Sequence, residues 1–184
     1  MAITLLLALV TAKVCAQNDD GIKVWQNYMT PGELHKMIAA ANGEWSGAIT
    51  MWMDAKTPPT QSTGTVTNEM IMGGRYQLAK TTGIMMGMPF EAMSLLGYDN
   101  AKKIFTSTWI DNFGTGTMTL EGTWNAPTRS IEFKGKAVDP MTGKDMDVRE
   151  LVKFTDNDNQ EMQMYERRNS TEIKTMEIKF SRKK

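Results

Sequence analysis

Apolar and polar residues alternate along most of this chain in short segments, each closed by residues that favour turns. Alternation with a period of two is typical of a β-strand that buries one face. From residue 44 onward, the pattern predicts strands over residues 44–54, 64–72, 75–82, 95–98, 103–111, 116–124, 130–138, 145–154, 161–167 and 172–182. We therefore expect sheet to dominate the structure.

The connections between these segments are short and rich in Pro, Gly, Asn and Asp, which tolerate turn geometry. Short connections join antiparallel neighbours, so the strands should follow one another as a meander. An open sheet of about ten strands would leave long unpaired edges, and closure removes them. We predict a single all-β domain over residues 30–184, an antiparallel meander closed into a barrel of about ten strands.

One short helix is expected before the barrel. Thr30-Pro-Gly-Glu33 matches a capping box, with Pro31 suited to the first helical position. The pattern predicts a helix over residues 31–41 that ends near Asn42, preceded by a polar spacer over residues 17–29.

The first and last predicted strands each carry an informative inward residue. Trp45 shares a face with Ile49 and Met51, and Arg182 shares a face with Ile178 and Phe180. A cation on an apolar face requires a partner or an aromatic surface. If these strands close the barrel, Trp45 can supply that surface.

Gly43-Glu-Trp45 after a short helix, with an inward arginine on the final strand, resembles the signature of the calycin group. This group contains lipocalins, fatty-acid-binding proteins and nitrobindin-like barrels. The resemblance implies a calycin-like barrel in which Trp45 and Arg182 pack across the closed end.

A second resemblance covers most of the chain after the N-terminal segment. The sequence looks like an uncharacterised bacterial family, domain of unknown function fifteen-seventy-nine, in the motifs Trp25-Gln-Asn-Tyr28, Met70-Ile-Met-Gly-Gly-Arg75-Tyr76, Met85-Met-Gly-Met-Pro-Phe90, Gly97-Tyr-Asp-Asn100, Ser107-Thr-Trp109-Ile-Asp111 and Asp139-Pro-Met-Thr-Gly-Lys144. This resemblance implies a secreted barrel and offers no established activity.

The N-terminus indicates export. An apolar run over residues 3–10 is followed by Val14-Cys15-Ala16, which predicts a signal peptide over residues 1–16 and a periplasmic or secreted protein. A lipoprotein site at Cys15 is the alternative, although Lys13 and Val14 stand where small residues are preferred. Cleavage after Ala16 would leave a mature chain without cysteine, which excludes disulfides and cysteine metal sites.

Charge and segment length exclude two classes of partner. The 21 basic and 21 acidic residues give a formal net charge of zero, so no field steers the protein to nucleic acid. The apolar run is too short to cross a bilayer of about 30 Å, so we expect no integral membrane segment in the mature chain.

Methionine is the unusual feature of the composition, with 17 residues in the chain. Flexible thioethers fill irregular apolar space and suit a tolerant hydrophobic pocket. Residues 84–93 read as an oily loop, which we predict to form the lip of the barrel. We expect a small hydrophobic ligand to contact Met86, Met88, Phe90, Trp109 and Met164. A Cu(I) site at the methionines is an alternative, with no histidine or cysteine beside it in the sequence.

Few residues support catalysis. The only histidine, His35, lies on the predicted helix and offers an axial haem ligand as an alternative to packing. Glu150 falls in phase with apolar neighbours, so its inward carboxylate requires a partner such as Arg75 or Arg182, or anchors a polar ligand group.

The leading hypothesis is an exported binding protein without a metal or cofactor, and the sequence leaves open whether it catalyses a reaction. A haem-binding or catalytic nitrobindin-like barrel and a structural or interaction module with a filled barrel remain alternatives.

Overall fold

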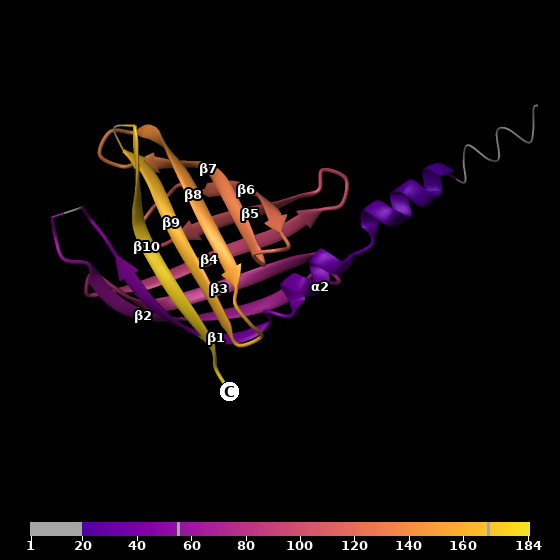
Figure 1. Ribbon diagram of the computed structural model, residues 1–184, viewed down its shortest axis with the longest axis horizontal. Coiled ribbons are helices and arrows are strands. Elements are labelled where there is room, and N and C mark those ends of the chain that lie inside the picture. The colour runs from indigo at the N-terminus through magenta and orange to yellow at the C-terminus, as the bar shows by residue number, and fades with distance from the viewer. Residues whose placement is uncertain (1–19, 55, 169) are drawn as a thin grey trace, which may run out of the picture.

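Ten antiparallel strands form the body of the protein in the computed structural model, which describes residues 20–54, 56–168 and 170–184. Each strand pairs with the next, and the first pairs with the last, closing the sheet into a barrel (Figure 1). The predicted all-β meander and its closure are confirmed. The predicted signal peptide, residues 1–16, lies outside the described residues.

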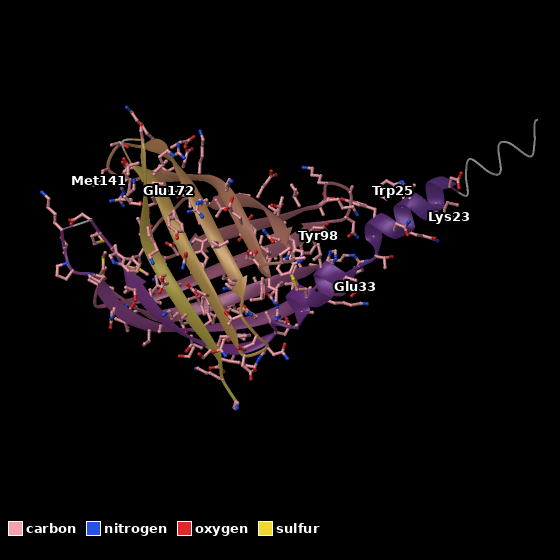
Figure 2. The ribbon with its side chains drawn as sticks, in the orientation of Figure 1. Lys23, Trp25, Glu33, Tyr98, Met141 and Glu172 are labelled. Atoms are coloured by element: carbon pink, nitrogen blue, oxygen red, sulfur yellow. The ribbon has the colours of Figure 1, made fainter. Side chains whose placement is uncertain are left out.

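The strands are β1 (Gly43–Met51), β2 (Thr60–Ile71), β3 (Tyr76–Met85), β4 (Met88–Asp99), β5 (Ile104–Asp111), β6 (Met118–Asn125), β7 (Ser130–Asp139), β8 (Lys144–Phe154), β9 (Asn159–Arg168) and β10 (Thr171–Arg182). The connections after the odd-numbered strands lie at one end of the barrel, which we call the open end. Figure 2 shows Met141, in the β7–β8 connection, and Glu172, early in β10, at this end. The opposite, closed end carries the helix α2 (Glu33–Ala39).

The segment 84–93 is strand, and the prediction of an oily loop is wrong. β3 and β4 meet in a two-residue turn formed by Met86 and Gly87, whose φ angles are 52° and 78°. This geometry is that of a type I′ hairpin. Pro89 breaks no strand pairing on the side of β4 that faces β5, because β5 pairs with β4 only from Ala92 onward. The segment therefore extends the wall at the open end.

The helix begins later than predicted and has a different cap. α2 starts at Glu33, and the ring nitrogen Nδ1 of His35 accepts a hydrogen bond of 3.0 Å from the N–H of Gly32. Thr30 instead donates its hydroxyl to the carbonyl of Gln26. Residues 20–29, expected as a spacer, are helical.

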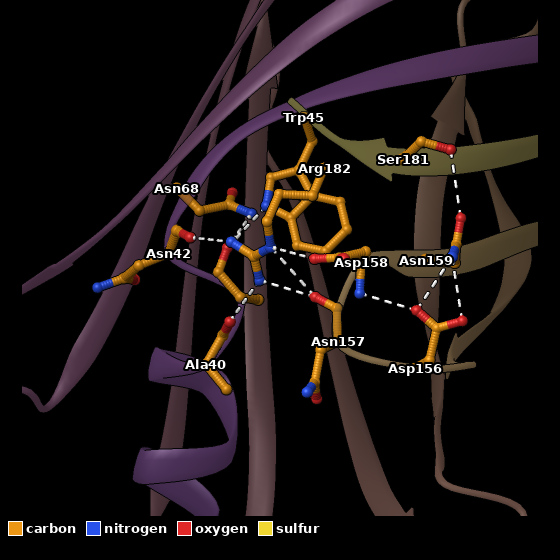
Figure 3. Close-up of polar contacts among 11 residues, drawn as sticks. Ala40, Asn42, Trp45, Asn68, Asp156, Asn157, Asp158, Asn159, Ser181 and Arg182 are labelled. Atoms are coloured by element: carbon orange, nitrogen blue, oxygen red, sulfur yellow. Dashed lines mark hydrogen bonds and ion pairs between the residues drawn. The ribbon is translucent and has the colours of Figure 1, made fainter. Parts of the chain in front are cut away.

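Arg182 links the β1–β10 seam to the end of the helix at the closed end (Figure 3). Its guanidinium lies 4.3 Å from the ring centroid of Trp45, its register partner across the β1–β10 seam. It also donates to the carbonyls of Ala40 and Asn42, at 2.7 and 2.5 Å. Carbonyls at the end of a helix lack intrahelical partners, so these bonds fix α2 to the seam.

Side chains fill one side of the barrel. The core cluster of buried residues joins the helix to β5–β8 and consists of Ile38, Phe105, Leu120, Ile131, Phe133 and Val148. Gly122 and Gly135 make this packing possible, since a Cβ at either would lie within 2.7 Å of Phe133 or Leu120, respectively. The filled side leaves the wall formed by β9, β10, β1 and β2 as the place for a site.

Candidate binding site in the barrel lumen

Inward-facing side chains along β9, β10, β1 and β2 are only partly buried. The pairing places Val66, Met164 and Ile178 on the same face as the buried Trp45, and each lies well inside its strand. All three nevertheless keep partial exposure. Phe105 and Ile131, in the core cluster, are completely buried by their neighbours. We call the space beside this wall the lumen.

Glu150 faces the lumen, as the alternation of its strand predicted. It pairs with Phe133 on β7 and Met164 on β9, within an uninterrupted register. Burial in these apolar surroundings raises the pKa of its carboxyl from the usual 4.5 to about 7. Among the described residues, no hydrogen bond or ion pair reaches this carboxyl, and burial is the sole cause of the shift.

The partners suggested for Glu150 are engaged elsewhere. Arg75 donates to the carbonyls of Met72 and Met29. Arg182 contacts Asp158, with 3.2 Å between Nε and Oδ1, in addition to its contacts at the closed end. The structural pair expected from the sequence is therefore not formed.

A β-bulge in β10 leaves a polar group buried on the outer side of this wall. The register steps from Lys174 opposite Tyr165 to Met176 opposite Met164, which leaves Thr175 as the extra residue. Thr175 continues the β1–β10 pairing opposite Trp52, so it lies on the outer face with Glu177, and it is only 8% exposed. Its hydroxyl is the one buried side-chain polar atom without a hydrogen-bond partner in the described ranges.

A pocket of about 340 Å³ opens beside this bulge, where β1 ends and β10 begins. Its lining includes Trp52, Asp54, Ile173 and Lys174 and is mainly apolar. The backbone N–H of Trp52 donates to the carbonyl of Thr175, so the bulge and the rim are tied together. Trp52 and Lys174 are in contact and face outward by the strand pairing, so this pocket lies at the rim on the outer side of the wall.

Other predicted ligand contacts lie across the barrel or at its rim. Phe90 is buried and stacks on Trp109, with ring centroids 6.4 Å apart, and its ring edge also meets Phe113. Met86 and Met88 are 66% and 52% exposed at the open end. Met164, in contrast, borders both the core cluster and the lumen.

His35 belongs to the closed end. It is 4% exposed, and its ring meets Tyr98 edge-on at 5.8 Å. Burial is the main influence on the pKa of His35 and lowers it, a hydrogen bond from the imidazole to the backbone carbonyl of Tyr98 raises it, and the charge of Arg75 lowers it further. The contact with Gly32 makes this histidine part of the helix cap.

Within the described residues, no group of three or more His, Cys, Asp or Glu side chains is arranged to hold a metal ion. No helix in the same ranges is long and apolar enough to cross a membrane.

The model of a family described as a protein of unknown function, DUF1579, matches residues 30–182. The chain belongs to the DUF1579 family. This match confirms the family resemblance drawn from the motifs. The barrel of this DUF1579 member is similar to the crystal structure of Rv2717c from M. tuberculosis, with a TM-score of 0.64 and 13% identity over 84% of this chain and 100% of the other. Identity at that level shows a shared fold alone. No curated protein matches the sequence.

Sequence reasoning about this DUF1579 chain missed the bulge at Thr175 and the methionines that extend the lumen wall beyond Met164. Met162 and Met176 alternate with polar residues and share the inward face with Met164. Their periodicity was visible, but the same periodicity describes a packed core. The bulge had no such signal, because it depends on how β10 pairs with its neighbours.

Proposed function

We propose that this protein is an exported binding protein that holds a small, mainly apolar molecule in the lumen. The observation that carries the proposal is the partial exposure of inward side chains in the middle of their strands, such as Val66 and Ile178. Barrels of this size can enclose one small ligand. Export rests on the N-terminal sequence pattern.

The chemistry of the wall supports an apolar ligand of variable shape. Methionines line it at Met162, Met164 and Met176, next to Ile178 and Phe180. Thioether side chains are flexible and polarisable, so they can repack around different ligands.

A fluorescence titration with N-phenyl-1-naphthylamine tests this proposal. The probe should bind the protein, freed of copurified molecules by organic extraction and refolding, in a one-to-one ratio. Ile178→Trp fills the lumen and should weaken binding at least tenfold. Lys179→Trp places the same ring on the outer face and should leave affinity unchanged, since Lys179 is exposed.

Circular dichroism should show the same fold in both variants. A well-folded protein that does not bind the probe would overturn the proposal. Equal affinity in Ile178→Trp and Lys179→Trp would also overturn it, because binding would then occur outside the lumen.

A further inference from the structure

Residues 20–29 form a helical arm that leaves the closed end of the barrel and points away from it (Figure 1). At about 100° per residue, its apolar side chains share one continuous face and its polar side chains share the other. The apolar set consists of Ile22, Val24, Trp25, Tyr28 and Met29. All five are exposed, from 46% for Tyr28 to 67% for Val24. Apolar helix faces pack against another surface in folded proteins, and the described residues do not cover this one.

The barrel holds the arm in this direction by its last carbonyl groups. The side-chain amide of Asn100, in the β4–β5 connection, donates at 3.2, 3.1 and 2.8 Å to the carbonyls of Asn27, Tyr28 and Thr30. Arg75, just before β3, donates to the carbonyl of Met29 at 2.7 Å. Carbonyls at the end of a helix lack intrahelical partners, so these bonds fix the base of the arm. The anchored arm is directed away from the surface of its own barrel.

A second exposed apolar surface begins at the base of the arm. It lies on the outer face of β3, β4 and β5, where four side chains are 38–42% exposed: Tyr76, Met93, Leu95 and Ile110. Met93 pairs with Ile110, and Leu95 pairs with the half-buried Leu78, two residues from Tyr76. These residues form one continuous surface, which we call the sheet patch. Tyr76 directly follows Arg75, so the sheet patch starts where the arm is anchored.

Charge and area indicate the partner of the arm. Its charged residues are Asp20 and Lys23, so it lacks the cationic face with which amphipathic helices bind anionic membranes. Two arms packed only on each other would bury on the order of 500 Å² per copy. Stable protein interfaces bury roughly 800 Å² per partner. The arm and the sheet patch together reach this area, which favours a second copy that engages both.

We propose that the protein forms a two-fold dimer in which the arm of each copy packs its apolar face on the sheet patch of the other. Two-fold symmetry makes the two contacts identical. Trp25 is the anchor of each contact, and Tyr28 meets its ring edge-on at 5.9 Å between centroids. Tryptophan and tyrosine are the side chains that most often dominate such interfaces. The sheet patch faces outward, so this inference is independent of the proposed lumen site.

Sedimentation velocity of the purified protein, from about 1 to about 100 μM, tests the inference because interfaces of this area reach at least micromolar affinity. The wild-type protein should be mainly dimeric. Trp25→Glu in the arm and Leu95→Glu in the sheet patch should each raise the dimer dissociation constant at least tenfold. Ile110→Glu repeats the sheet-patch test at a second position. Met141→Glu is the matched control, since it adds the same charge to an exposed apolar residue at the open end, and it should leave the dimer unchanged.

The outcomes decide both the dimer and its arrangement. Circular dichroism should show the same fold in all four variants. A wild-type protein that is monomeric at the highest concentration, or a dimer that persists in Trp25→Glu, would overturn the inference. A dimer lost in Trp25→Glu and kept in both sheet-patch variants would show that the arms pair with each other, and would also overturn it. Loss in the arm and sheet-patch variants, with Met141→Glu still dimeric, supports it.

Discussion

Arg182 stacks on Trp45 across the seam where the last strand meets the first, with 4.3 Å between the guanidinium carbon and the ring centroid. The indole N–H of Trp45 donates to the carbonyl of Ala41 at 2.9 Å, and Arg182 donates to carbonyls on either side of it. These two residues therefore connect barrel closure to the end of the helix.

Arg182→Lys should reduce the free energy of unfolding by about 2 kcal/mol, because a lysine keeps the charge but cannot stack and donate along several directions at once. Urea denaturation followed by tryptophan fluorescence measures the change. Lys183→Gln is the control, since the pair of Lys183 with Glu44 is solvent-exposed and should contribute less than about 0.5 kcal/mol. Equal effects of the two substitutions would contradict the role assigned to Arg182.

Glu150 should make the protein less stable as the pH rises from acidic values toward neutrality. Its folded pKa, about 7, lies above the usual 4.5, so the folded state binds more protons between these values. Stability should fall from about pH 4.5 to pH 7, by up to about 3 kcal/mol, and then level off. Denaturation of the ligand-free protein across this range should show the slope, and Glu150→Gln should abolish it. A slope that is unchanged in Glu150→Gln would assign it to other groups.

Met86→Asn should stabilise the protein by a few tenths of a kcal/mol to about 1 kcal/mol. Met86 holds a positive φ in the first position of a type I′ turn, which asparagine before glycine adopts at lower cost. Thermal denaturation measures the gain. Met141→Asn is the control. Met141 is an exposed turn residue whose φ angle is not positive, so this substitution should change the stability little. A clear loss of stability in Met86→Asn would contradict the turn assignment.

Local patterns were sufficient to predict the meander and its closed seam. Turn residues recur between alternating segments, and the inward positions of Trp45 and Arg182 follow from a period of two. The inward position of Glu150 followed in the same way. These features depend on neighbours along the chain, or on a register that alternation sets.

The features that define the candidate site depend on contacts between strands. The bulge at Thr175 shifts the register between β9 and β10, and no turn residue marks it in the sequence. Gly87 and Pro89 suggested a loop because sequence alone did not show that β4 extends beyond its neighbour β5. Whether inward side chains fill a barrel depends on the sum of their volumes around the whole barrel. The packed region around Phe133 and the open region around Ile178 therefore show the same alternating pattern in the sequence.

Methyl NMR of methionine-labelled protein during titration with N-phenyl-1-naphthylamine tests the central claim most directly, because it shows where the ligand binds. The account predicts that the signals of the lumen residues Met162, Met164 and Met176 shift together, while those of the exposed Met93 and Met141 do not. Shifts confined to exposed methionines, or no shift in the lumen at saturating probe, would contradict it.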